Sequence, residues 1–416
     1  MKLRVLICSG NLGNALPDPD SIAAWLPKDG CYSEVVENPY YPLPDPDERD
    51  TLLQELQVKT IPDRAPTESE NEHGDHFDII VIGLQEATFS VKEENGEIKP
   101  DLLPIVQPLL DKAQKKLTKV AEKGFATVTT LTGSTDHTVE KKENVLTDWM
   151  KAQDSNLIQQ LFADRCPSYD FAVRFQRGQM RLEILVRKEL EASVLSVRAQ
   201  NTGLAKVAAN KGGIVAELLV GGTTRITFCT AHLEAHEGME KYNFRCQMLT
   251  DILQGTADDS IPGIKYDMSL KSHFMFVLGD LNFRTEIANL DKQEHRALVD
   301  DYISNKNWRE LNKADELFRA LRDKDMAVGF RTLPCYFPPT FKVQRGVGFV
   351  YVDNRRPSYT DRILWKCGNL LDSKVVPTAY EPVEQFVTSD HKPIRGAFEI
   401  ELNQFVKLRE PRMLYV

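Results

Sequence analysis

The sequence predicts an α/β fold of the α+β type, in which a β-sandwich of two sheets is flanked by helices. Short apolar runs of strand length recur along the 416 residues, and stretches with helical spacing lie between them. No linker separates one group of elements from the next, and no segment repeats. A chain with 42% hydrophobic residues can bury a large core, so the pattern favours a single domain.

The individual elements follow from the hydrophobic spacing. Strands are expected at residues 3–9, 77–84, 126–131, 169–176, 181–187, 193–198, 214–220, 225–231, 273–278, 363–366 and 394–402. Helices are expected at residues 101–123, 238–253 and 286–304. The Gly221-Gly222 pair predicts a hairpin between two of these strands.

The segment at residues 16–75 is rich in Pro, Asp and Glu. This composition predicts a surface insertion with one short helix near residues 51–57. We therefore expect one domain over residues 1–405 that carries this insertion, followed by a C-terminal tail at 406–416.

Charge and composition exclude several classes of protein. The formal net charge is −9, so the globally basic face of a nucleic-acid-binding protein is not expected. No apolar run reaches the roughly 18 residues that a membrane-spanning helix needs. The seven cysteines are odd in number and scattered, which favours a reducing compartment over a disulfide framework. We expect a cytoplasmic protein, peripheral at any membrane it binds.

Polar residues follow the apolar strand at residues 273–278 directly. Asp280 and Asn282 are two positions apart, so in an extended chain their side chains face the same way. A carboxylate can activate a water, and an amide can bind a phosphoryl oxygen. The alternative is an ordinary Asp/Asn turn after a buried strand.

A second group of polar residues lies near the C-terminus. A histidine that touches phosphate needs an orienting carboxylate, and Asp361 is a candidate for His391. Asp390 is adjacent to His391, so these two side chains must leave a turn, which Pro393 supports. The alternative is a set of surface ion pairs.

Further polar residues end other strands. Asn11 ends the first strand and Glu86 follows the second, where a carboxylate suits the hard-oxygen preference of magnesium. Lys211 precedes a Gly-Gly pair, which allows close backbone approach beside a cation, although a plain turn is the alternative. His232 and His236 are four apart, but the string lacks the internal Glu of a zinc protease motif.

Taken in order, these strings resemble the inositol polyphosphate 5-phosphatases of the endonuclease/exonuclease/phosphatase superfamily. The two signatures of that family stand here as Gly-Asp-Leu-Asn-Phe-Arg at 279–284 and Pro-Ser-Tyr-Thr-Asp-Arg-Ile-Leu at 357–364. The second signature separates the family from its nuclease relatives. The resemblance spans the chain apart from residues 16–75 and 131–157. It implies two mixed sheets packed face to face and a catalytic phosphatase domain with Mg²⁺ as cofactor.

The resemblance also implies roles for single residues. Glu86 would bind magnesium, with Asn11 and Asp390 close to the metal. Asp280 would deprotonate the attacking water, and Asp361 would orient His391. The phosphoryl oxygens would be held by Asn282, His232 and His391. The remaining substrate contacts would come from Lys211, Arg284, Lys342, Arg345 and Arg355. The substrates would be inositol polyphosphates or phosphoinositide head groups, which lose their 5-phosphate.

The chain departs from the family pattern at three points. Gly10 stands where the family often has Trp, so we expect aromatic packing beside the site to be lost. Phe341 replaces a Tyr and Asp353 replaces a Lys. Recognition of the neighbouring 4-phosphate would then depend on Lys342 and Arg355, helped by Arg345.

Two other functions remain open at this point, a nuclease of the same superfamily and an inactive phosphoinositide-binding scaffold. The nuclease would share the metal and water-activating positions, but the second signature and the acidic charge count against it. Residues 346–351 form an apolar segment between the Lys342 and Arg355 strings. It predicts either transient contact with a membrane surface or a hairpin that packs inward. The oligomeric state is not predicted.

Overall fold

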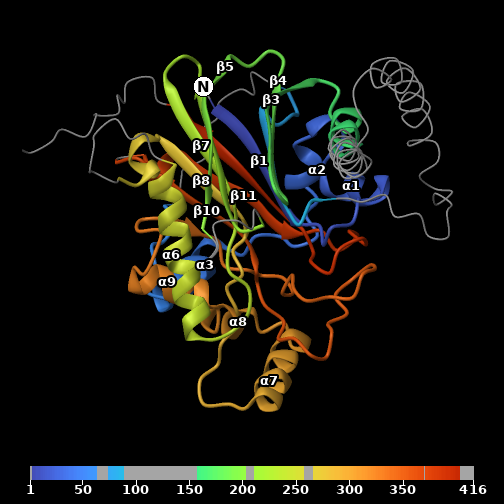
Figure 1. Ribbon diagram of the computed structural model, residues 1–416, viewed down its shortest axis with the longest axis vertical. Helices are drawn as coiled ribbons and strands as arrows, with labels where there is room; N and C mark the ends of the chain where they lie inside the picture. The colour runs from blue at the N-terminus through green and yellow to red at the C-terminus, as the bar shows by residue number, and fades with distance from the viewer. Residues whose placement is uncertain are drawn as a thin grey trace, which may run out of the picture. The chain divides into compact units, whose positions relative to one another are not determined.

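The computed structural model describes residues 2–62, 74–88, 157–202, 210–256, 266–369 and 371–402. The described residues of 1–87 and 160–416 belong to one compact unit, and those of 88–159 belong to a second. The first unit contains two six-stranded mixed sheets packed face to face (Figure 1). The expected two-sheet fold is therefore confirmed. The predicted helix at 101–123 and the strand at 126–131 lie outside the described residues.

The first sheet has the strand order β11-β12-β1-β2-β4-β3. Its strands are β1 (Lys2–Asn11), β2 (Ile79–Gln85), β3 (Tyr169–Arg177), β4 (Met180–Arg187), β11 (Val375–Pro382) and β12 (Ile394–Glu401). β1 and β2 are parallel, and their other neighbours are antiparallel. Every residue of β2 is buried, as expected for a central strand covered on both faces.

The second sheet has the order β5-β6-β7-β8-β10-β9. Its strands are β5 (Ala192–Asn201), β6 (Gly212–Val220), β7 (Thr224–His232), β8 (Phe274–Asp280), β9 (Arg331–Thr332) and β10 (Asp361–Cys367). β7 and β8 are parallel, whereas β10 runs antiparallel to β8. Each sheet thus has one central parallel pair, and both pairs end in polar residues.

An aromatic cluster joins the two sheets. Phe276 of β8 lies with its ring centroid 5.7 Å from that of Phe228 and 5.1 Å from that of Phe398, which belongs to the other sheet. Trp365 of β10 lies 5.4 Å from the same Phe398 ring. Successive residues of β8 alternate between faces, so Met275 and Val277 pack instead against the outer helix α6 (Met239–Gly255).

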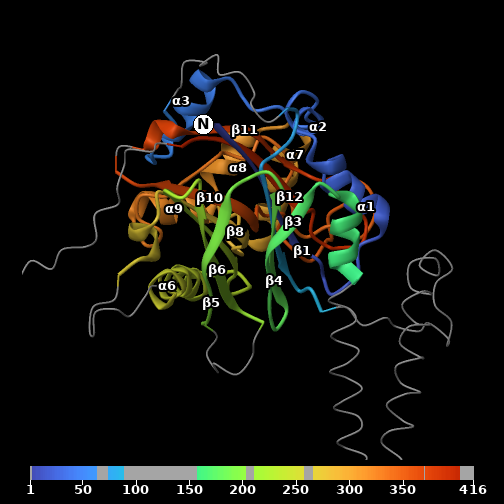
Figure 2. The same ribbon diagram turned by 90° about the horizontal axis from the view of Figure 1, so that it is seen from above.

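Helices cover the outer faces of the sandwich. Figures 1 and 2 show α6 and α1 (Pro19–Trp25) on opposite flanks. The remaining labelled helices are α2 (Ser33–Val36), α3 (Pro46–Glu55), α7 (Lys292–Ser304), α8 (Trp308–Lys313) and α9 (Glu316–Asp323). No helix of the described ranges is both long and apolar enough to cross a bilayer.

The segment at 16–75 differs from its prediction as a surface insertion with one helix. Its described part carries α1, α2 and α3, and buries Trp25 and Leu53 completely. Asp18 and Asp45 cap α1 and α3, and a proline begins each helix. Pro19 and Pro46, two of the prolines that suggested an irregular insertion, therefore begin helices.

Gly10 corrects a second expectation, the loss of aromatic packing. A Cβ atom on Gly10 would lie 2.9 Å from Trp25 Cη2 and 3.2 Å from the Cβ of Pro393. The indole of α1 therefore fills the space that a side chain at position 10 would need. Its Nε1 donates to the Ile394 carbonyl at 3.2 Å, which ties α1 to the start of β12.

Two buried ion pairs join α9 to the site region. Arg362 of β10 pairs with Asp315, the N-cap residue of α9, and both side chains are almost wholly buried. Burial raises the pKa of Asp315, and the charge of Arg362 opposes that rise only in part. Arg245 of α6 bonds Glu316 at 2.5 Å. Each cation therefore compensates a carboxylate that water cannot reach.

We expect Arg362→Met to lower the free energy of unfolding by about 3–5 kcal/mol, because Asp315 would stay buried without its partner. Urea unfolding followed by circular dichroism measures the change. Arg322→Met is the matched control, since its pair with Asp323 is exposed on the same helix α9 and should contribute little. Equal unfolding midpoints for the two variants would contradict this assignment.

Candidate active site

The polar ends of the central strands meet at one end of the sandwich. His232 ends β7 and Asp280 ends β8, and the two residues are register partners. Asp361 begins the antiparallel strand β10 directly opposite Asp280. Asn11 ends β1 in the facing sheet, and its amide reaches Asp280 across the sandwich. The fold therefore gathers residues that are up to 350 positions apart in sequence.

Asp280 is the centre of this group and is only 2% exposed. Its Oδ2 accepts from Asn11 Nδ2 at 2.9 Å and lies 3.3 Å from His232 Nε2, while its Oδ1 accepts from the Asn282 amide at 3.1 Å. Burial alone would raise the pKa of Asp280. The hydrogen bond to His232 and the charges of His391 and Lys211 outweigh burial and hold this pKa below its usual range. The carboxylate is therefore ionised at neutral pH.

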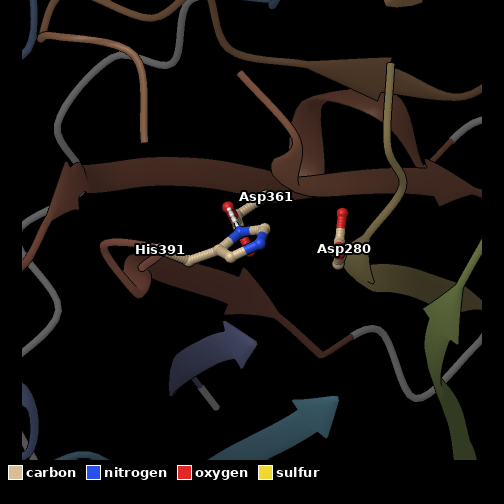
Figure 3. Close-up of side chains that lie close together, drawn as sticks. All are labelled: Asp280, Asp361 and His391. Atoms are coloured by element: carbon tan, nitrogen blue, oxygen red, sulfur yellow. Dashed lines mark hydrogen bonds and ion pairs between the residues drawn. The ribbon is translucent and has the colours of Figure 1, made fainter. Parts of the chain in front are cut away.

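His391 lies between two carboxylates. Its Nδ1 is 3.0 Å from Asp361 Oδ2, and the ring extends toward Asp280 (Figure 3). Asp361 Oδ2 also accepts from Thr340 and Thr360 at 2.8 and 3.0 Å, which fixes the carboxylate. Burial lowers the pKa of His391, but Asp361 and the neighbouring carboxylates raise it to about 9. The imidazole is therefore a cation that can donate a hydrogen bond into the site.

Asn282 is fixed on both sides of its amide. Its Nδ2 donates to the Leu233 carbonyl at 3.1 Å, and its Oδ1 accepts from Arg284. The Arg284 guanidinium lies 4.8 Å over the ring of Phe341, whose centroid is 4.5 Å from that of His391. The Phe341 ring therefore contacts both the Arg284 guanidinium and the His391 imidazole. It occupies this position without the hydroxyl that a Tyr would add.

Lys211 contacts the other histidine. Its Nζ lies 2.5 Å from His232 Nε2, the same atom that faces Asp280. Burial lowers the pKa of Lys211, and the charges of Asp280 and Glu86 oppose that shift. The lysine thus lies beside His232 and close enough to Asp280 for their charges to interact.

A cavity of about 210 Å³ opens onto these groups. Most of the residues predicted from the sequence line it: Glu86, Lys211, His232, Asp280, Asn282, Arg284, Lys342, Arg355, Asp390 and His391. Asn11 and Asp361 lie behind this lining, where they bond Asp280 and His391. Glu237 also lines the cavity and was missed, although it directly follows the recognised string that ends at His236.

Arg345, a predicted substrate residue, and Asp353, which replaces a family lysine, both lie outside the lining of this cavity. Arg345 is not among the residues that line the cavity, and its Nη2 donates to the Gly13 carbonyl at 3.1 Å. Asp353 is exposed and lines a neighbouring cavity instead. The Asp353 carboxylate, which replaces the family lysine, is therefore absent from the lining of the site cavity.

Acidic groups in this region can hold a metal ion. Glu86 and Asp390 line the same cavity, and Asp390 Oδ2 accepts from Lys342 Nζ at 2.8 Å. Burial would raise the pKa of Asp390, but His391 and Lys342 lower it, so a carboxylate is present. These hard oxygen donors fit a divalent cation such as Mg²⁺.

In a second cluster of possible metal ligands, two of the side chains are already hydrogen-bonded to each other. Ligand atoms of Asp280, Asp361 and His391 lie within 4.8 Å of one another. A metal bound to all three would have to displace the hydrogen bond between His391 and Asp361. Glu86 and Asp390 line the same cavity outside this cluster, and Asp390 is paired with Lys342.

Comparison with known proteins identifies the relatives of this chain. The model of endonuclease/exonuclease/phosphatase family 2 matches residues 45–397. Phosphatidylinositol 3,4,5-trisphosphate 5-phosphatase 2B of Danio rerio is 31% identical over 232 residues, which cover 53% of this chain and 18% of that protein. Inositol polyphosphate 5-phosphatase K of Mus musculus is 29% identical over 270 residues, which cover 60% of this chain and 54% of that protein. The matches thus span less than a fifth of the first relative and about half of the second.

Solved structures with the same fold include both an enzyme domain and a nitric oxide complex. The inositol polyphosphate 5-phosphatase domain of SPsynaptojanin, solved with inositol (1,4)-bisphosphate and calcium ion, has a TM-score of 0.58 at 18% identity, covering 96% of this chain and 84% of that one. A point mutant of Cimex nitrophorin in its ferrous NO complex has a TM-score of 0.52 at 16% identity, covering 96% and 99%. At these identities the likeness establishes the fold alone. The family match covers most of the chain, so the chain belongs to the endonuclease/exonuclease/phosphatase family 2, with inositol polyphosphate 5-phosphatases among its relatives.

Proposed function

We propose that this protein is a magnesium-dependent phosphomonoesterase that removes the 5-phosphate from inositol polyphosphates and phosphoinositides. One observation carries the proposal. An ionised, buried Asp280 shares a cavity of about 210 Å³ with a cationic His391 and with Lys211, Arg284 and Lys342. A base beside converging cations is what hydrolysis of a phosphate ester requires, and the named activities of the relatives supply the substrate class.

The residues of the chain suit direct attack by water. Asp280 takes a proton from the attacking water, and Asn11 and His232 hold the carboxylate in place through its Oδ2. His391 donates to a phosphoryl oxygen while Asp361 fixes the orientation of its ring. This arrangement uses in-line positioning and charge and needs no covalent intermediate.

We assign the metal to Glu86 and Asp390, with Asn11 beside them. Magnesium supplies neutralisation of phosphoryl charge when bound. Without it, Lys342 is the cation that accompanies Asp390, at 2.8 Å. Lys342 is thereby held at the cavity wall, where a second, non-reacting phosphate of the substrate can reach it.

Two alternatives make different demands on the site. A nuclease would need a surface that attracts a polyanion, and the net charge of −9 does not favour one. The nitrophorin likeness shows that the fold also occurs in a structure solved as a nitric oxide complex, so the fold does not decide between catalysis and binding. The buried ionised Asp280 favours catalysis, because a scaffold has no use for a water-activating base.

The apolar segment at 346–351 has both inward and outward residues. The Tyr351 hydroxyl donates to the Pro339 carbonyl at 2.7 Å, and its ring packs near Phe349. Val347 and Val350 are 66% and 55% exposed. The hairpin interpretation therefore fits Tyr351, whereas the two valines are the side chains we assign to transient contact with a membrane surface.

The proposed activity is tested by phosphate release from a panel of soluble inositol polyphosphates, phosphoinositides in vesicles, and DNA. We expect release from inositides that carry a 5-phosphate, loss of this activity in EDTA, and recovery with Mg²⁺, because Glu86 and Asp390 offer only hard oxygen ligands. Undiminished activity after exhaustive chelation would remove the metal assignment. Cleavage of DNA without release from any inositide would replace the phosphatase by a nuclease.

Asp280→Ala should reduce kcat by about 10²–10⁴-fold, since the general base is lost. The purified variant should keep its near-ultraviolet circular dichroism, because the main chain of β8 remains paired with β7 and β10. Gln176→Ala is a surface control with no predicted effect on turnover. Wild-type kcat in the Asp280 variant would exclude it from proton transfer.

The membrane assignment predicts weaker binding of Val347→Asp/Val350→Asp to phosphoinositide vesicles in co-sedimentation, with unchanged hydrolysis of soluble substrate. Val328→Asp is the matched control, because Val328 is a similarly exposed valine, at 57%, outside residues 346–351. Equal vesicle binding by all three proteins would make the segment structural only.

A further inference from the structure

A second and larger cavity lies beside the one that contains Asp280. Its volume is about 510 Å³, and its walls are α7 and the turn at residues 353–356. Glu237 and Arg355 line both cavities. The turn therefore forms the partition between the two, and Arg355 is the cation on that partition.

Among the described residues, no hydrogen bond or ion pair holds the Arg355 side chain. The residue is exposed, and no carboxylate of the described residues forms an ion pair with its guanidinium. Its neighbour Arg356 differs, because it bonds Glu286 at 3.1 Å and lies 3.6 Å from Glu237. The position of Arg355 is therefore set by the main chain of the turn.

Arg296 of α7 holds that main chain. Its Nη1 donates to the carbonyls of Val352 and Arg355 at 2.7 and 2.8 Å, with a longer contact to Asp353 at 3.3 Å. The two short bonds use both hydrogens of this nitrogen. One guanidinium thus joins the beginning and end of the turn.

The Arg296 guanidinium is itself fixed. Its Nε lies 2.8 Å from both carboxylate oxygens of Asp300, one turn later on α7. The Arg296 side chain is 19% exposed, so these bonds are partly shielded from water. A lysine could pair with Asp300 but lacks the planar fork that reaches the carbonyls at the same time.

We propose that Arg296, oriented by Asp300, is a positioning residue that sets Arg355 against a non-reacting phosphate of the substrate. The inference rests on the proposed function for its substrate and goes beyond it in assigning a specificity role to α7. We call the bonds from Arg296 to the Val352 and Arg355 carbonyls the clasp. Loss of the clasp should weaken binding of the substrate and of the transition state alike. The effect then falls on KM and leaves kcat nearly unchanged.

Steady-state kinetics on one soluble inositol polyphosphate tests this role. Arg296→Ala and Arg296→Lys should each raise KM by roughly tenfold with kcat within about twofold, in the range expected for loss of hydrogen bonds to a charged group. Arg322→Ala, a surface arginine of α9, should match wild type. A fall in kcat with unchanged KM, or full rescue by lysine, would overturn the proposal.

A double-mutant cycle separates positioning from an independent effect. In an Arg355→Ala background, adding Arg296→Ala should change KM by less than about twofold, because Arg296 acts only through Arg355. If the KM increase of the double variant equals the product of the two single-variant increases, the proposal is overturned.

Amide hydrogen exchange makes the test independent of activity. A peptide covering residues 350–358 should exchange faster in Arg296→Ala than in wild type or Arg322→Ala, whether or not any inositide is hydrolysed. An unchanged exchange rate for this peptide in Arg296→Ala would show that Arg296 does not hold the turn. Faster exchange in a protein that hydrolyses no inositide would retain the clasp and reject the proposed function.

Discussion

Asp280 is buried yet ionised, and the arrangement of both sheets around the site compensates its charge. Asp280 is 2% exposed, so its charge must be compensated by groups that are themselves held in place. Asn11 donates to it from the facing sheet, and His232 Nε2 on the neighbouring strand lies 3.3 Å from it. These partners come from different sheets, so the site forms only when the sandwich is closed.

The buried charges around Asp280 are compensated in turn by further charged or polar side chains. His391 is kept cationic by Asp361, and Asp361 is fixed by two threonine hydroxyls. Behind these, Arg362 neutralises Asp315 where β10 meets α9. The second sequence signature thus carries two tasks in adjacent residues: Asp361 serves the site, and Arg362 anchors the strand.

Much of this could be predicted from the sequence, because strand-terminal polar residues follow apolar runs that are easy to recognise. Asp280, Asp361 and His391 were expected together, and the structure brings them together. The expected loss of aromatic packing at Gly10 was wrong because its replacement, Trp25, comes from a different segment. Local pattern does not reveal which distant side chain fills a space.

The same limit applies to α1 and to Arg296. Proline and acidic residues at 16–75 suggested an insertion, but Asp18 and Asp45 are helix caps. Arg296 resembles any surface arginine until its three carbonyl partners are seen. Long-range contacts to main-chain atoms leave no mark on composition or spacing.

The proposed reaction is attack of an Asp280-activated water on the phosphorus of the 5-phosphate. Hydrolysis of a soluble inositol polyphosphate in ¹⁸O-water, with ³¹P NMR and mass spectrometry of both products, tests it most directly. We expect phosphate that carries one ¹⁸O and an inositol product with an unlabelled hydroxyl at position 5. Label in the ring hydroxyl, or loss of phosphate from another position, would contradict it.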